Sequence, residues 1–425
     1  MKQLILTAAF LITLSVPGFC QAITEESLDW AACVKETRQN NPELVAASQK
    51  ITQSWAGKMK SVSGLLPQIS GSTDVQTAKA AAGSSKSRAS TYSYGLNGQQ
   101  LVFDGFKTAA DIEQAQKIVE AFHYGYAVTS SNVRLKLRTA YAGLLRAQEL
   151  LHLTEQIAEK RKQNQDMIRL RYEAGREHRG SLLTAQADLA QANFEVDQAM
   201  RNVDLSIRRL AKELGRTRIP TPLKAAGSLD FPDRDKTRPD FESLAETTPL
   251  LQRLIVEKEA AKYGVSSAQS AFFPQVYASA ALEKSDSVWL PQKSNWVAGA
   301  TVSMPFFDGG NLASTLVKNR AVLGQAEADE KSGRDGVLFT LEQTWASFRD
   351  ARDQVWVQRK YLEANREREK IATAQYSSGL LSFNEWIIIE DNLVKAAKSY
   401  LDAQAAAMIA EAAWIQAKGE TLDEA

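Results

Sequence analysis

Two periods of hydrophobic and polar residues occur along this chain of 425 residues. In some segments the apolar residues recur every seven positions, as in Leu137, Leu144, Leu151 and Ala158, which is the spacing of a coiled-coil seam. In others, apolar and polar residues alternate one by one, as in Gln275–Glu283. Alternation over about ten residues is typical of membrane β-strands. The chain is therefore predicted to combine long helices with strands.

The whole pattern occurs twice. The pattern of Val133–Leu145 recurs in Val337–Arg349, and at the same offset Gly175 corresponds to Gly379. A repeat of this length indicates a duplicated domain-sized unit, because solenoid repeats have periods of about 20–50 residues.

Prolines mark out where long helices can form. No proline occurs from Gln68 to Ile219 or from Phe306 to Ala425, and proline both removes a helix donor and clashes with the preceding turn. The glycine at the end of each periodic stretch predicts a helix C-terminus where the chain turns back. Each repeat is therefore predicted to contain one long helical hairpin, at residues 105–215 and 309–419.

The alternating segments precede these hairpins and predict pairs of strands at about 68–78 and 91–103, and at about 275–284 and 296–307. The predicted organisation is a signal peptide (1–22), a first repeat (23–218), a linker with neither period (219–240), a second repeat (241–419) and a tail (420–425).

The first 22 residues have the features of a secretory signal, with Lys2, the apolar run Leu4–Val16 and small residues before a cleavage point after Ala22. The alternative is a membrane anchor, but the run is shorter than the roughly 20 residues needed to span a bilayer. Lipidation at Cys20 is a further alternative, although the residues before it fit a lipidation site poorly. If Cys20 leaves with the signal, Cys33 is the single remaining cysteine and no intrachain disulfide can form.

Composition argues against several classes of function. The formal net charge is +1, with 51 basic and 50 acidic side chains, which gives no electrostatic basis for binding nucleic acid. The three histidines have no metal-ligand spacing, and there is no phosphate loop or nucleophile motif. The sequence predicts neither an enzyme nor a cofactor or metal site.

Four predicted strands cannot close a barrel, and open sheet edges are not tolerated in lipid, so several copies must share one barrel. Two copies would give about eight strands, whose interior fills with side chains, and three would give about twelve, with room for an aqueous bore. Cyclic symmetry would then place the helical hairpins around the same axis.

Several short motifs recur in a fixed order. They are "NPEL" at Asn41–Leu44, "LLPQIS" and "FFPQVY" before the first strand of each pair, "FDG" after the second, and "YEAG" and "YSSG" at the helix turns. In order and duplication, from about Ile23 to Gly419, the chain resembles the TolC-like outer-membrane efflux protein family. The resemblance implies a mixed α and β membrane protein, namely a homotrimer with a twelve-stranded outer-membrane barrel and an α-helical periplasmic tunnel.

The resemblance also implies a location in the outer membrane of a Gram-negative-type bacterium. The function implied is the exit duct of a tripartite efflux or type I secretion system, which passively conducts substrates from a periplasmic adaptor (membrane fusion) protein and an inner-membrane pump. The alternative is a periplasmic coiled-coil adaptor or structural protein without a barrel. That alternative explains the heptads but not the alternating segments.

In the family, the helix turns form the periplasmic entrance. The chain keeps the family's tyrosine as Tyr376, but it has Leu381 in place of an arginine and Ser181 in place of an acid. Of the two acid positions that line the entrance, one is Glu385 and the other is the apolar Ile388. We therefore expect altered polar contacts and closure that depends more on apolar contact.

Glu385 has a second interpretation, because Ser382 and Glu385 also fit a capping box. Both interpretations stay open. Asp104 and Asp308, each within an "FDG" motif, are predicted to be helix N-caps.

The turns at Gly175 and Gly379 are also candidates for adaptor docking. The first turn is basic, with Arg171, Arg176 and Arg179. These arginines are interpreted either as a solvated helix end or as part of a surface that binds the adaptor.

Overall fold

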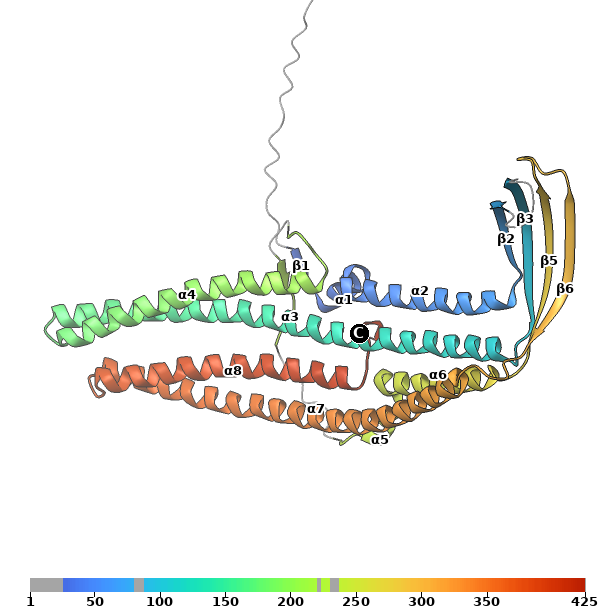
Figure 1. Cartoon of the computed structure of the whole chain (residues 1–425). Coiled ribbons are helices and arrows are strands. Elements are labelled where there is room, and N and C mark those ends of the chain that lie inside the picture. The colour runs from blue at the N-terminus through green and yellow to red at the C-terminus, as the bar shows by residue number, and fades with distance from the viewer. Residues whose placement is uncertain (1–25, 80–87, 220–222, 230–236, 425) are drawn as a thin grey trace, which may run out of the picture.

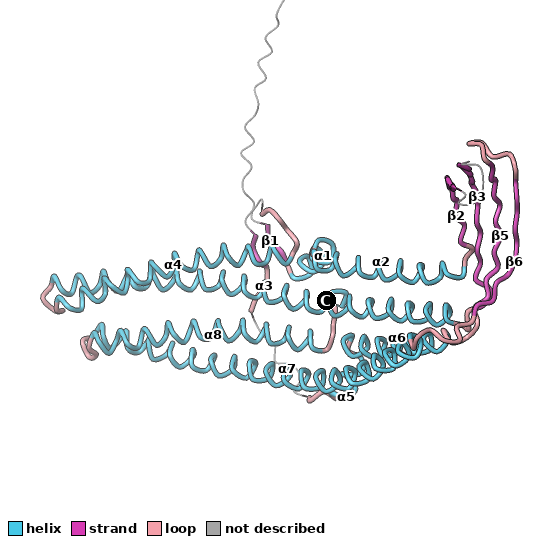
Figure 2. Tube along the Cα trace, viewed as in Figure 1, coloured by secondary structure: helices cyan, strands magenta, loops and turns pink. Residues whose placement is uncertain are grey.

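The computed structural model describes residues 26–79, 88–219, 223–229 and 237–424, so the predicted signal peptide lies outside the described residues. The described chain is a long, narrow layer of helices that carries a sheet at one end (Figure 1). Figure 2 shows that the strands gather at this end, apart from one short pair near the middle of the layer.

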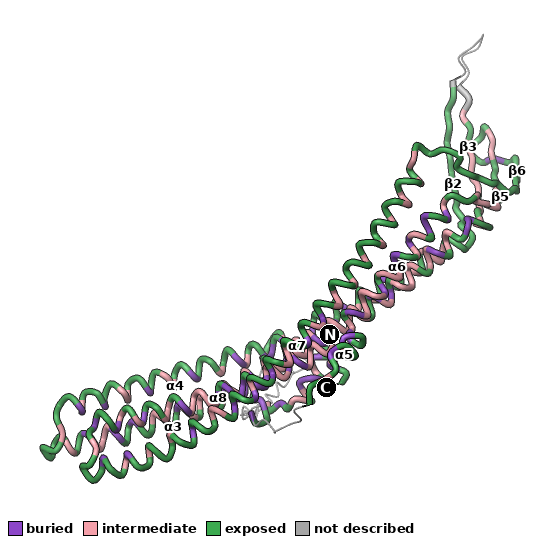
Figure 3. The backbone as a smooth tube through the Cα atoms, turned by 90° about the horizontal axis from the view of Figure 1, so that it is seen from below, coloured by how far each residue is buried: buried purple, intermediate pink, exposed green. Residues whose placement is uncertain are grey.

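Two helices of 67 residues run along the layer, α3 (Lys107–Glu173) and α7 (Asn311–Ser377). Two shorter helices lie end to end beside α3, namely α2 (Pro42–Val62) and α4 (Arg179–Glu213). Two more lie end to end between α3 and α7, namely α6 (Pro249–Ser270) and α8 (Phe383–Ala417). The layer is therefore four helices wide, and Figure 3 shows that it bends near the middle of its length.

The helices of the two repeats correspond in length, since α4 and α8 both have 35 residues. On the heptad positions Leu137, Leu144 and Leu341 have no exposed surface. Heptads and alternation do not predict α2 and α6, although Pro42 and Pro249 stand at the first helical position, which is a helix-start signal. None of the helices in the described part of the chain has the length and apolar character needed to cross a membrane.

Short elements cover the middle of α3. β1 (Glu26–Leu28) pairs in parallel with β4 (Leu223–Ala225), and α1 (Trp30–Asn40) follows β1. On α3, Tyr141 is buried beneath them, against Trp30, and its hydroxyl donates to the carbonyl of Ala226. The predicted linker, residues 219–240, thus contains a strand of three residues, which is too short to show a period.

Over α7 the covering element is α5 (Phe241–Thr247), whose Phe241 packs against Trp414 of α8. The predicted tail, residues 420–425, adds Leu422 to the core around α3, where it is 1% exposed. The described parts of the linker and the tail, together with β1 and α1, therefore pack at mid-length, away from both the sheet and the helix turns.

The sheet has four antiparallel strands in the order β2 (Gln68–Lys79), β3 (Arg88–Phe103), β5 (Gln275–Asp286) and β6 (Ser294–Ser303). Among the described residues of the chain, β2 and β6 each have one unpaired edge. The last strand ends four residues before the predicted end at 307, because Pro305 has no N–H to donate to a ladder.

The register gives the sheet two unlike faces. One row across all four strands is apolar and consists of Gly71, Leu96, Leu282 and Trp296. The next row, on the opposite face, consists of Ser72, Gly95, Glu283 and Asn295. The apolar side chains are exposed in the single chain, and Trp296 is 75% exposed.

The same local structure joins each strand pair to its long helix. The N-cap residues are Phe106 and Gly310, so the prediction that Asp104 and Asp308 occupy the N-cap position is wrong by two residues. Their carboxylates still accept backbone N–H groups of the first turn, from Thr108 at 2.7 Å and from Leu312 at 2.8 Å. Each aspartate reaches over two residues of left-handed backbone, which are Gly105 and Phe106 in repeat 1 and Gly309 and Gly310 in repeat 2.

Candidate functional site

The helix turns lie at the end of the layer opposite to the sheet (Figure 1). Gly175 and Gly379 have φ of 69° and 81°, a left-handed conformation that strongly favours glycine. The N–H of the next residue bonds back in each case, from Arg176 to the carbonyl of Arg171 and from Leu380 to that of Gln375. Both turns are therefore Schellman motifs, and each reverses the chain within a few residues.

A set of contacts ties the two turns together, and we call it the turn contact. Tyr376 is 2% exposed, and its ring stacks on Trp386 with centroids 4.5 Å apart. The Tyr376 hydroxyl donates to the carboxylate of Glu177 at 2.9 Å. The guanidinium of Arg171 lies 4.5 Å over the Tyr376 ring and donates to the carbonyls of Tyr376 and Ser377 at 3.2 and 3.0 Å.

Glu177 is the charged partner in the turn contact. Burial would raise its pKa, but hydrogen bonds from Ser181 and Tyr376 hold the pKa of this carboxyl below its ordinary value. Burial and the neighbouring Glu177 raise the pKa of Tyr376 to about 12. At neutral pH an ionised carboxylate therefore accepts from a neutral phenol, and hydrogen bonds to charged acceptors are the stronger kind.

Glu177 was not predicted from the sequence, because the family's acid position corresponds to Ser181. The structure brings the two residues together, with the Ser181 hydroxyl donating to Glu177 at 2.9 Å. Ser181 is 1% exposed, and its N–H bonds to the ring of His178, the N-cap of α4. The available signal was an acid close to the turn, one helical turn before the position where an acid was expected.

In the second turn Glu385 completes the predicted capping box with Ser382. Hydrogen bonds from the Ser382 side chain and N–H lower the pKa of this exposed carboxyl. Leu381 is half-buried against the apolar cluster that contains Tyr376, whereas Ile388 is 58% exposed. The turn contact thus involves residues of both repeats, and the apolar Leu381 packs beside it.

The three basic residues of the first turn separate into two kinds. Arg171 is engaged by the turn contact, whereas Arg176 and Arg179 are exposed and form no ion pair within the described residues. On the second turn Leu380 is 80% exposed. The tips therefore present free positive charge on one repeat and an apolar side chain on the other.

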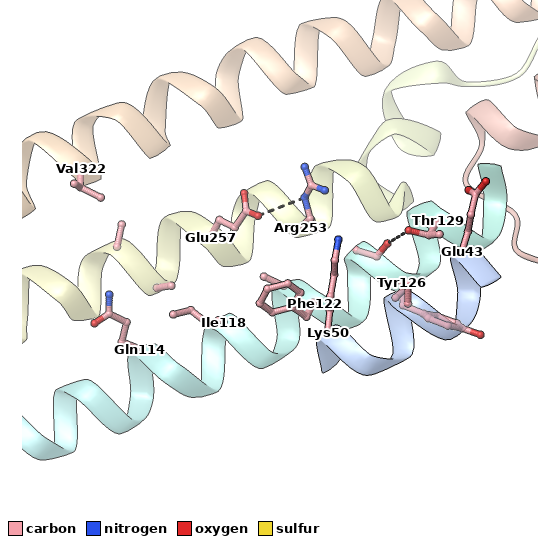
Figure 4. Close-up of a pocket in the computed structure, with 16 residues that line it drawn as sticks. Glu43, Lys50, Gln114, Ile118, Phe122, Tyr126, Thr129, Arg253, Glu257 and Val322 are labelled. Atoms are coloured by element: carbon pink, nitrogen blue, oxygen red, sulfur yellow. Dashed lines mark hydrogen bonds and ion pairs between the residues drawn. The ribbon is translucent and has the colours of Figure 1, made fainter. Parts of the chain in front are cut away.

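A cavity of about 630 Å³ lies farther up the layer, among α2, α3, α6 and α7 (Figure 4). Ile118 and Phe122 of α3 form much of its apolar lining, and Lys50 reaches over it from α2. Arg253 faces Glu257 of its own helix at 3.4 Å. No pattern in the sequence predicts this cavity.

The model of the outer membrane efflux protein family matches residues 33–216 and 242–420. The chain belongs to the outer membrane efflux protein family. This efflux protein is 22% identical to the outer membrane efflux protein BepC of Brucella suis biovar 1 over 406 residues, which cover 93% of the chain and 87% of BepC.

Solved structures share the fold of this efflux protein at low identity. CusC matches with a TM-score of 0.82 at 16% identity, over 91% of each chain. The CmeC outer membrane channel of Campylobacter jejuni matches with a TM-score of 0.81 at 17% identity, over 91% of this chain and 84% of CmeC. The family and the fold confirm the predicted resemblance and the predicted outer-membrane efflux function, and they do not favour a periplasmic adaptor without a barrel.

Proposed function

We propose that this efflux protein acts as a homotrimer. Its twelve strands would form an outer-membrane barrel, and its helices a periplasmic tunnel that conducts substrates passively from an adaptor protein and an inner-membrane pump. The observation that carries the proposal is the sheet, which has one exposed apolar face, one polar face and two unpaired edges.

The sheet fits a membrane barrel in three respects. Its apolar face suits lipid and its polar face suits an aqueous bore, which is the alternation of transmembrane β-barrels. Aromatic side chains lie toward both ends, with Tyr92 against Trp289 at the tip and Phe103 against Phe106 near the helices. Its edges must pair with further copies, because unpaired backbone groups are not stable in lipid.

The edges of the helical layer support the same assembly. On α7, the outermost helix on one side, Phe339 and Trp356 are 65% and 62% exposed. On α4, at the opposite edge, Phe194 and Leu205 are 53% and 56% exposed. Large apolar side chains on both edges suit contact with neighbouring copies. Three copies around one axis would then close both the sheet and the helical layer.

The turns would form the periplasmic entrance of the tunnel. The turn contact joins the two hairpins of each chain and would hold the entrance narrow. Three copies of Glu385 near the axis would form an acidic ring. Its three like charges repel one another, and a cation in the ring would offset this repulsion, so the ring would favour cations. Arg176, Arg179 and Leu380 are exposed at the tips and would take part in docking the adaptor.

Conductance of the purified protein in planar bilayers tests the entrance. Tyr376→Phe removes one hydroxyl and with it the bond to Glu177, so we expect a larger conductance than in the wild type. Tyr172→Phe is the matched control, because Tyr172 occupies the corresponding position in repeat 1 and is 39% exposed. Equal conductance of Tyr376→Phe and wild type would contradict the proposal that the turns form the entrance. A soluble monomer without channel activity would contradict the proposed function as a whole.

A further inference from the structure

Charged residues line the seam between the two hairpins, where α3 packs against α8 and also reaches side chains of α7. Arg146 pairs with Asp402 at 2.5 Å, and Lys160 pairs with Glu369 at 3.0 Å. In these pairs the cation is on α3 and the acid is on a helix of repeat 2. A third pair, Arg161–Glu390, has the same polarity and is buried.

Arg161 forms the centre of this buried group, which we call the seam cluster: Arg161, Asn164, Glu390 and Asp391. One arm of the Arg161 guanidinium donates to Glu390 at 2.9 Å, and the other donates to Asp391. Asn164 donates to the same oxygen of Glu390 at 2.5 Å. Arg161 is 7% exposed and Glu390 4%. The cluster lies roughly 15–20 Å along the helices from the two turn glycines.

One oxygen of Glu390 is left without a donor. Its Oε1 is buried with no hydrogen-bond partner, and the Nζ of Lys160 is 4.0 Å away. A buried, ionised oxygen without a donor is destabilising. Burial is also the main reason that the pKa of Glu390 is raised, although Asn164 and Arg161 act in the opposite direction.

The charges around Glu390 come from every helix that packs there. They are Lys160 and Arg161 on α3, Asp188 on α4, Arg366 and Glu369 on α7, and Asp391 on α8. Asp188 also has a buried oxygen without a partner, and burial and the nearby Asp391 raise its pKa, although Arg161 acts in the opposite direction. The buried carboxyl of Glu390 and the partly buried carboxyl of Asp188 therefore both favour protonation when the hairpins are packed together.

We propose that the seam cluster is a second closing contact of the entrance, in which Arg161 and Glu390 position α8 against α3 and the contact tightens when Glu390 takes up a proton. This inference rests on the proposed function of the turns as the entrance. Glu390 and Arg161 act by positioning the helices that carry the turn contact, and they do not touch the substrate.

The sign follows from linkage between protonation and packing. A carboxyl whose pKa is raised in the packed state binds its proton more tightly there than when it is solvated. Its stabilising contribution is therefore full below the ordinary glutamate range and is lost as pH rises through the raised pKa. Lowering the pH from neutral toward 4.5, the reference pKa of glutamate, should therefore favour the closed entrance. The turn contact behaves oppositely, because the lowered pKa of Glu177 means that this contact weakens only at lower pH.

Planar-bilayer conductance from about pH 7.5 down to about pH 5 tests the proposal, in a range where Glu177 stays ionised. On acidification, the ratio of closed to open wild-type channels should rise. The rise should be up to about tenfold for each unit by which the pKa of Glu390 in the packed state exceeds its pKa in the solvated state. Glu390→Gln mimics the protonated group, so it should be as closed at neutral pH as the wild type is in acid, and its pH response should be reduced. Asp188→Asn together with Glu390→Gln should remove the remaining response.

Two further variants complete the experiment. Arg161→Met leaves Glu390 without its cation, so it should be more open at neutral pH and respond more strongly to acid. Glu363→Gln is the matched control, since Glu363 is an exposed residue of α7 that pairs with Lys360 of its own helix, and its pH profile should equal that of the wild type.

The outcomes separate this inference from the proposed function. A wild-type pH profile in Glu390→Gln, or an entrance that opens when Glu390 is neutralised, would overturn the proton-tightened contact while leaving the channel function intact. Absence of any conductance in the wild type would overturn both.

Discussion

The seams within each hairpin differ in chemistry from the seam between the hairpins. Inside the second hairpin, the ring centroids of Trp345 on α7 and Trp414 on α8 are 5.2 Å apart. Val355 of α7 packs against Ala403 and Ala407 of α8. Between the hairpins, ion pairs such as Arg146–Asp402 join α3 to α8. The heptads therefore hold each hairpin together by apolar burial, whereas the seam between the hairpins adds ion pairs to apolar contacts such as those of Leu401 and Met408 with the core around α3.

This difference has a mechanical consequence. Apolar burial is roughly proportional to area and does not depend on pH, so each hairpin should move as one body. A buried ion pair contributes little net stability, because desolvation offsets the attraction, and it responds to protonation of its members. The seam between the hairpins is thus the place where a modest change of charge can alter the packing of the layer.

Removing one member of the buried Arg161–Glu390 pair should lower the stability of the protein most. Arg161→Met leaves Glu390 buried without its main cation, and removal of one partner from a buried pair typically costs about 3–5 kcal/mol. Arg161→Met with Glu390→Met should recover much of this loss, because neither charge of the buried pair remains. Thermal unfolding followed by circular dichroism checks both. Equal destabilisation of the single and double variants would show that packing at Arg161, not its charge, matters.

Breaking an apolar seam should come next. Leu341 has no exposed surface and belongs to the cluster of Phe348 and Trp414, so Leu341→Ala should cost about 2–5 kcal/mol. Leu341→Met keeps most of the volume and should cost less than about 1.5 kcal/mol. The loss in Leu341→Ala should be the same at neutral and mildly acidic pH. A strongly pH-dependent loss would contradict the distinction between the two kinds of seam.

The sequence predicts the parts of the fold that have a local period. The heptads around Leu137 and Leu341 and the alternation of Gln275–Glu283 are repeated many times, so each reveals its element without knowledge of the rest. The cover over α3 has no such signal, because Glu26 pairs with Leu223 across nearly two hundred residues, and only three pairs define the ladder. Long-range contacts between short segments leave no period to detect.

The candidate site divides in the same way. The turn glycines and the capping box of Glu385 depend on neighbouring residues and are visible in the sequence. The contact of Glu177 with Tyr376 depends on how two hairpins pack. The family pattern places an acid at position 181, four residues after Glu177. Side chains four residues apart can reach the same place, so Glu177 can supply the acid that Ser181 lacks. The buried Arg161–Glu390 pair was missed because nothing in either helix alone reveals its partner.

The exposed pair should give the smallest effect and the most direct comparison with the buried one. Arg146 and Asp402 join the same two helices as Arg161 and Glu390, but their side chains are 39% and 54% exposed. A double-mutant cycle with Arg146→Ala and Asp402→Ala should therefore give a coupling of about 0.2–1 kcal/mol, which falls as salt is added. Because both charges are solvated whether the hairpins are packed or apart, neither variant should change the pH dependence of conductance. If this exposed pair coupled as strongly as the buried one, burial could not be the property that distinguishes them. The charge pattern of the whole seam would then set the packing of the two hairpins.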